Sequence, residues 1–132
     1  LAATPFIPSM VSRMWGNEAK VRQLIDGTGS HLDDAGIAQY LTLVRRPAHV
    51  DGTLAMMAAW RVDRLMAGAA GLTVPTLLIA SAGDRIVPPR VSVEAARMLP
   101  RAELREMPGL GHLVHEEDAG AVIAVIGDWL RA

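Results

Sequence analysis

Apolar residues recur at helical spacing through the first half of the chain, in three segments separated by polar or glycine-rich breaks. The first helix is predicted over about Asn17–Ile25, where Asn17 caps the N-terminus and Gly27-Thr28-Gly29-Ser30 stops the helix. A second helix is predicted over about Asp34–Val44 and a third over about Val50–Met66. The pattern indicates that the first region of the chain is entirely helical.

The period of the pattern changes after the glycines at 68–71, where short apolar runs begin to alternate with helical segments. The predicted elements are a strand within Thr73–Ala82, a helix over Ser92–Met98, a strand over Ala102–Met107 and a helix over Ala119–Leu130. Alternating strands and helices are typical of a parallel α/β layer. We therefore expect a helical region over residues 1–70 and an α/β region over residues 71–132.

Two parallel strands do not form a stable sheet alone. Leu77, Leu78 and Ile79 point to alternate faces of the first strand, and the run predicts a strand buried on both faces. Each such side chain left in water forgoes about 1.5–3 kcal/mol, against a domain stability of about 5–15 kcal/mol. We therefore expect the rest of the sheet to lie outside these residues. A first residue Leu1 rather than Met agrees with a processed or incomplete chain.

The composition narrows the class of protein. The 132 residues are 51% hydrophobic and 20% charged, which is typical of a folded domain. A net charge of -1, from 13 basic and 14 acidic residues, gives no reason to expect a nucleic-acid partner. No apolar run approaches the ~20 residues of a membrane-spanning helix. The chain has no cysteine, so it holds no disulfide, no thiolate nucleophile and no cysteine-ligated metal.

Two residues are the strongest candidates for chemistry. Asp84 follows the first predicted strand through Gly83, and His112 follows the second strand between Gly111 and Leu113. Ligands bind at the carboxyl ends of parallel strands, so both side chains are expected at that edge of the sheet. An aspartate can orient a histidine that takes and returns a proton. The structural alternatives are a turn aspartate ahead of the prolines and a surface-loop histidine.

Other motifs carry weaker signals. His112 and His115 with Glu116 have a spacing at which two histidines can bind a metal, but no third ligand is evident, so no metal is expected. Glu116, Glu117 and Asp118 are expected to begin the last helix. Gly27-Thr28-Gly29-Ser30 lacks the lysine of a phosphate-binding loop, and we interpret it as a helix stop with Ser30 as the next N-cap.

The helical region is rich in methionine and tryptophan. Met56, Met57 and Trp60 are the candidate substrate-binding residues, because such side chains adapt to irregular apolar ligands. The alternative, that they fill the core of the helical region, is the commoner role.

The order strand, Gly-Asp-Arg-Ile-Val-Pro-Pro, helix, strand, Gly-Leu-Gly-His and closing helix resembles the C-terminal part of the α/β-hydrolase family. The resemblance implies that Asp84 is the acid and His112 the base of a Ser-His-Asp triad, with the helices of residues 1–70 as a cap. No Gly-x-Ser-x-Gly occurs in the chain, so the serine that attacks an ester or related acyl carbon would lie outside it. The resemblance implies no cofactor.

A finer resemblance lies in the cap. The segments Ile7–Met10, Leu24–Ser30 and His49–Met57 are similar to the branch of the family that acts as an accessory of magnesium chelatase. This resemblance implies a cytoplasmic protein of bacteriochlorophyll biosynthesis, with a small apolar substrate such as a tetrapyrrole and magnesium chelatase as a partner. It also implies an alternative to catalysis, namely a non-catalytic accessory protein that binds a tetrapyrrole or a chelatase subunit.

Overall fold

A computed structural model describes residues 7–132, which divide into two compact units. The first contains residues up to Ile25 together with Leu32–Arg61, and the second contains Asp26–His31 together with Val62–Ala132. Residues 1–6 of the predicted 1–70 cap lie outside the described part. The predicted boundary between cap and core at residues 70 and 71 stays a prediction. The short segment Asp26–His31 belongs to the unit that carries both strands.

The first unit is helical. Its helices are α1 (Ile7–Trp15), α2 (Glu18–Gly27, whose last residues join the second unit), α3 (Asp34–Val44) and α4 (Pro47–Ala58). Val21, Ile25 and Ile37 form its buried core. The Asn17 side chain accepts a hydrogen bond from the Lys20 N–H at 3.0 Å, so it caps α2 as predicted.

Two predictions for the helical region are wrong. The single helix over Val50–Met66 is two helices, α4 and α5 (Val62–Gly68). Neither buries a side chain, so no packing holds a continuous helix across residues 59–61. Ser30 is not the N-cap of α3, because the Asp33 carboxylate accepts from the Gly36 N–H at 2.8 Å and caps that helix.

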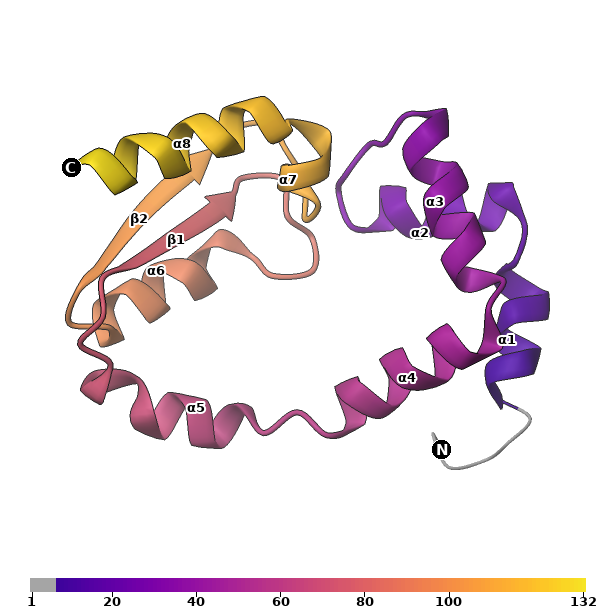
Figure 1. The fold of residues 1–132 in the computed structure, drawn as a ribbon, viewed down its shortest axis with the longest axis horizontal. Helices are drawn as coiled ribbons and strands as arrows, with labels where there is room; N and C mark the ends of the chain where they lie inside the picture. Colours follow the sequence, from indigo (N-terminus) through magenta and orange to yellow (C-terminus); the bar gives the residue numbers. More distant parts are fainter. Residues whose placement is uncertain (1–6) are drawn as a thin grey trace. The chain divides into compact units, whose positions relative to one another are not determined.

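The second unit contains the parallel α/β layer that the sequence predicts. Its elements are α5, a short 3₁₀ turn η1 (Ala69–Gly71), β1 (Thr76–Ser81), α6 (Pro89–Met98), β2 (Ala102–Met107), α7 (Val114–Glu117) and α8 (Ala119–Arg131). β1 and β2 pair in parallel from Thr76 with Ala102 to Ser81 with Met107. α6 packs against both strands, and α8 runs along their other side in Figure 1.

Local chemistry sets the ends of these elements. β1 is shorter than the predicted run because Pro75 has no N–H, and the ladder begins when the Thr76 N–H donates to the Arg101 carbonyl at 2.9 Å. The prediction that Glu116 and Glu117 begin the last helix is wrong, since both lie in α7. Asp118, with extended φ, separates α7 from α8 and caps α8 through the Ala121 N–H at 2.8 Å.

β1 is incompletely covered. Ala80 and Ser81 at its end are buried, but Leu77, Leu78 and Ile79 are only half-buried, so the prediction of a strand buried on both faces does not hold here. Within the described residues, the edge of β1 opposite β2 has no partner strand. No helix in that part of the chain has both the length and the apolar character needed to span a membrane.

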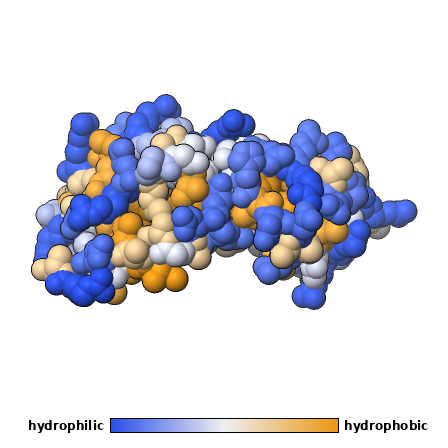
Figure 2. All heavy atoms as spheres, turned by 90° about the horizontal axis from the view of Figure 1, so that it is seen from above, coloured by the Kyte–Doolittle hydropathy of each residue, from blue (hydrophilic) through white to orange (hydrophobic). Residues whose placement is uncertain are grey.

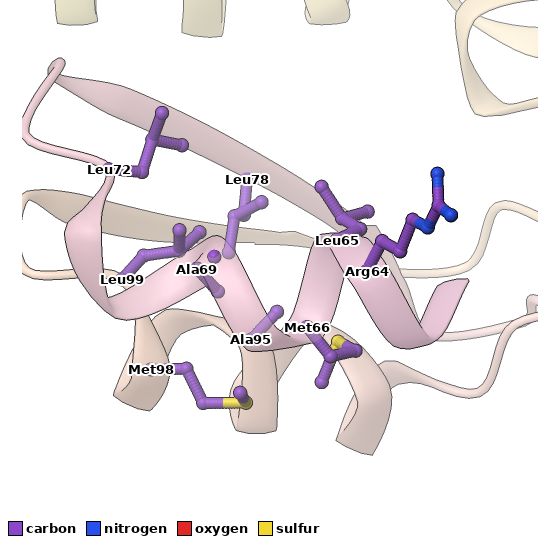
Figure 3. A pocket seen from close by; sticks show the side chains of 10 residues that line it. Arg64, Leu65, Met66, Ala69, Leu72, Leu78, Ala95, Met98 and Leu99 are labelled. Atoms are coloured by element: carbon purple, nitrogen blue, oxygen red, sulfur yellow. The ribbon is translucent and has the colours of Figure 1, made fainter. Parts of the chain in front are cut away.

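An apolar groove of about 410 Å³ opens beside β1 (Figure 3). Its walls come from α5, η1 and α6, with Leu78 of β1 between them, and Figure 3 shows Leu65, Leu72 and Leu99 around it. Figure 2 shows apolar residues gathered at the surface among hydrophilic ones. The exposed large apolar side chains include Leu65 and Leu72. The second unit therefore presents apolar surface that its own elements do not cover.

Residues 1–132 produced alone should be insoluble or molten, because the open edge of β1 and the uncovered groove leave the α/β layer without its apolar cover. Near-UV circular dichroism and thermal unfolding measure this directly. A sharp near-UV signal with a cooperative thermal transition would show that the two strands and their helices suffice.

Candidate active site

Asp84 is fixed by the turn that ends β1. Its N–H donates to the Ser81 carbonyl at 3.1 Å, and its Oδ1 accepts the N–H groups of Ile86 and Val87, both at 2.8 Å. This is the turn role given above as the structural alternative for this residue. It uses one carboxylate oxygen and leaves the other, Oδ2, for a second partner.

That second partner is His112. Asp84 Oδ2 lies 2.9 Å from His112 Nδ1, so the structure brings together the two residues that the sequence singled out. The side chains are 11% and 35% exposed, respectively. A carboxylate can only accept, so Nδ1 carries the proton and, in the neutral ring, Nε2 is the basic nitrogen. The arrangement is that of a histidine oriented by a carboxylate for proton transfer.

The environment of Asp84 favours its charged form. Burial by itself raises the pKa of the carboxyl, but the hydrogen bonds from His112, Val87 and Ile86 lower it by more. The net effect is a pKa below the ordinary value of an aspartate. Asp84 is therefore ionised at neutral pH, as an orienting carboxylate must be.

The loop that carries Asp84 is joined to the loop that carries His112. The Leu110 carbonyl accepts from the Gly83 N–H at 2.8 Å and also from the Ser81 hydroxyl. A Cβ at Gly83 would come within 2.6 Å of the Leu110 oxygen, so only glycine allows this approach without a shift. These contacts hold the two loops side by side, close to the carboxyl ends of β1 and β2.

The segment Asp26–His31 packs against the histidine loop from the other side. A Cβ at Gly111 would overlap the backbone of Gly29 and Ser30, so glycine is required for this contact. Ser30 is 0% exposed, and its Oγ accepts the Leu113 N–H at 2.7 Å. The Arg85 N–H donates to the Thr28 carbonyl at 3.1 Å and joins the same segment to the aspartate turn.

Glu117 also contacts the histidine loop, and the sequence did not predict this contact. Its Oε2 accepts the Gly111 N–H at 2.7 Å, and its Oε1 accepts the His31 N–H at 2.9 Å. The neighbours of Ser30 and Glu117 in the sequence predict helix ends at both positions. Ser30 binds Leu113, 83 residues away, and Glu117 binds His31, 86 residues away, as well as the nearby Gly111; local sequence carries no signal of the two distant contacts.

A hollow of about 380 Å³ lies beside the Asp84–His112 pair, at the end of β1. Both side chains line it, together with Ser81, Val87 and residues of α6, α7 and α8. His115 also lines it, is 62% exposed and lies 3.5 Å from Glu116. Among residues 7–132, no three side chains of His, Cys, Asp or Glu gather as metal ligands would.

The candidate substrate-binding residues lie in the first unit. Met56 and Met57 are in α4, Trp60 follows it, and all three are exposed. They do not fill the core of that unit. Their role in binding stays a prediction.

The geometry and the fold agree with the comparisons with known proteins. The chain belongs to the alpha/beta hydrolase family, whose pattern matches residues 2–125. It is similar to the magnesium-chelatase 30 kDa subunit of Rhodobacter capsulatus, with 46% identity over 131 residues that cover 99% of this chain and 46% of that protein. The predicted fold class and the resemblance to the magnesium chelatase accessory branch are confirmed. The chain spans about half the length of this curated relative.

The stability of the protein should depend on the ionisation of Asp84. Because folding lowers the pKa of Asp84, the stabilisation is complete above the ordinary carboxyl pKa of about 3.9 and is lost as the pH falls through the lower native value. Urea unfolding of the complete protein across this range should show the loss, and Asp84→Asn should lack that part of it. A constant difference between the two proteins at every pH would contradict the assignment.

Gly111→Ala should destabilise the complete protein by about 1–3 kcal/mol or more, since the added Cβ overlaps backbone that cannot move aside cheaply. Gly52→Ala is the matched control: it lies inside α4 with no atom within 4 Å of the added Cβ, and alanine favours a helix by up to about 1 kcal/mol. Thermal midpoints of both variants test this. Equal midpoints would show that the segment Asp26–His31 does not pack on the loop.

Proposed function

We propose that this chain is the acid and base part of a serine-type α/β-hydrolase that cleaves an ester or related acyl bond. The observation that carries the proposal is the 2.9 Å hydrogen bond between Asp84 Oδ2 and His112 Nδ1, on a carboxylate already held by its own turn. Membership of the alpha/beta hydrolase family supports the same chemistry. The nucleophilic serine lies in a part of the complete protein outside these residues.

The proposed steps follow from the positions of the protons. His112 Nε2 takes the proton of the serine hydroxyl as the oxygen attacks the acyl carbon, and the ring becomes an imidazolium. Asp84 stays ionised and stabilises that cation through Nδ1. His112 then gives the proton to the leaving group, and the same cycle with water releases the acid. N–H donors for the developing oxyanion lie with the serine, outside this chain.

The setting of the reaction is also a proposal. Similarity to a magnesium-chelatase subunit supports a role in bacteriochlorophyll biosynthesis, in the cytoplasm, with magnesium chelatase as a partner. A small apolar substrate, of which a tetrapyrrole is one class, suits the exposed Met56, Met57 and Trp60 of the first unit. No cofactor takes part in the proposed chemistry.

A second function has its own support. The relative's name describes a subunit of a chelatase, not a hydrolase, and a fold does not fix the chemistry that it carries. In this alternative the protein is a non-catalytic accessory that binds a tetrapyrrole or another chelatase subunit. The Asp84–His112 pair would then be a structural hydrogen bond.

His112→Ala in the complete protein separates the two functions. A hydrolase should lose at least about 10³-fold in the turnover of an activated ester, because triad members act as a unit. His49→Ala, which removes an exposed histidine of α4, is the matched control and should keep full turnover. Unchanged esterase turnover in His112→Ala would end the catalytic assignment.

The accessory function predicts a different pattern in the same proteins. The protein would have no esterase activity above background. Porphyrin binding would fall in Met57→Ala and Trp60→Ala, because both substitutions remove exposed apolar surface. Porphyrin binding should barely change in His112→Ala under either function. Fluorescence titration with protoporphyrin, run beside the esterase assay, distinguishes the two.

A further inference from the structure

Both backbone N–H groups that flank His112 donate to side chains, one from the helix α7 that follows the loop and one from the segment Asp26–His31. The Gly111 N–H donates to Glu117 Oε2 at 2.7 Å, and the Leu113 N–H donates to Ser30 Oγ at 2.7 Å. His112 itself is held from a third direction by Asp84 at 2.9 Å. The imidazole is therefore fixed at its side chain and on both sides of its backbone.

Glu117 does more than stabilise its own helix. The first turn of α7 is closed by backbone bonds, in which the N–H groups of Glu116 and Glu117 donate to the Leu113 carbonyl at 2.8 and 3.0 Å. A helix cap would bind the N–H groups at the helix start. The Glu117 carboxylate instead binds the N–H of Gly111. This hydrogen bond joins residues on either side of His112 in the chain.

We propose that Glu117 is the positioning residue of the His112 loop, and that the buried Ser30 holds the other side of this loop. We call these two side chains and their hydrogen bonds to the loop the clamp. The inference rests on the proposed function, in which His112 is the base. A carboxylate suits the task because its two oxygens accept one N–H each, from Gly111 and from His31. By this second contact Glu117 also joins the segment Asp26–His31 to the loop.

The test is Glu117→Gln in the complete protein. A glutamine side chain has one oxygen acceptor, so one of the two N–H groups loses its partner. The matched control is Glu116→Gln, which makes the same change of charge one residue earlier, on a carboxylate that lies 3.5 Å from His115 Nε2. Two readouts are taken: the low-field ¹H NMR signal of the His112 Nδ1 proton, and kcat and KM for an activated ester.

We expect Glu117→Gln to broaden or shift the Nδ1 proton signal and to lower kcat by about 10- to 10²-fold with KM unchanged, because small misplacement of a reacting group has costs of that order. Glu116→Gln should leave both readouts as they are. Loss of thermal stability alone, with the proton signal and kcat unchanged, would overturn the proposal.

The NMR signal separates this inference from the proposed function. If His112→Ala shows that the protein is not an esterase, the Nδ1 signal in Glu117→Gln still reports whether Glu117 orients His112, and an unchanged signal overturns the clamp. If Glu117→Gln does not fold, Ser30→Ala removes the acceptor of the Leu113 N–H and should change the same signal in the same way. An unchanged signal in Ser30→Ala would then overturn the proposal.

Discussion

The site depends on the carboxylate of Asp84, whose two oxygens bind different partners. Oδ1 of Asp84 binds the two N–H groups of the turn after β1, and Oδ2 binds the imidazole of His112. The turn contacts fix the direction in which Oδ2 points, so the histidine meets an acceptor that is already oriented. They also help to keep the pKa of Asp84 low against the effect of burial, which keeps the acceptor charged. The turn thus contributes to both the geometry and the electrostatics of the site.

Local patterns predicted much of the fold. The helix over Asp34–Val44 and the strand over Ala102–Met107 have the predicted bounds, because apolar period and flanking breakers act on the same few residues. The division between α4 and α5 was not predictable in this way, since residues 59–61 hold neither glycine nor proline. It reflects missing tertiary packing, which a local pattern does not record.

The candidate site was predictable only where its residues follow the strands. Asp84 and His112 lie in the loops that follow β1 and β2, so chain order brings both to one edge of the sheet. Ser30 and Glu117 have no such position. Local rules predict helix ends at both positions, but Ser30 and Glu117 bind residues that only the folded backbone brings near them. The half-buried β1 and the match to about half of the relative's length fit the proposal that further strands complete the layer.

The bond between Ser30 and Leu113 also bears on the order in which the protein folds. It joins residues 83 positions apart in the chain. Closing a loop of that size costs conformational entropy before the contact can return any stabilisation, and contacts of large sequence separation slow folding. The contacts within β1, α6 and β2 join residues that lie closer together in the chain, so closing them costs less entropy. On these grounds the Ser30 contact with the histidine loop is expected to form after the contacts within β1, α6 and β2.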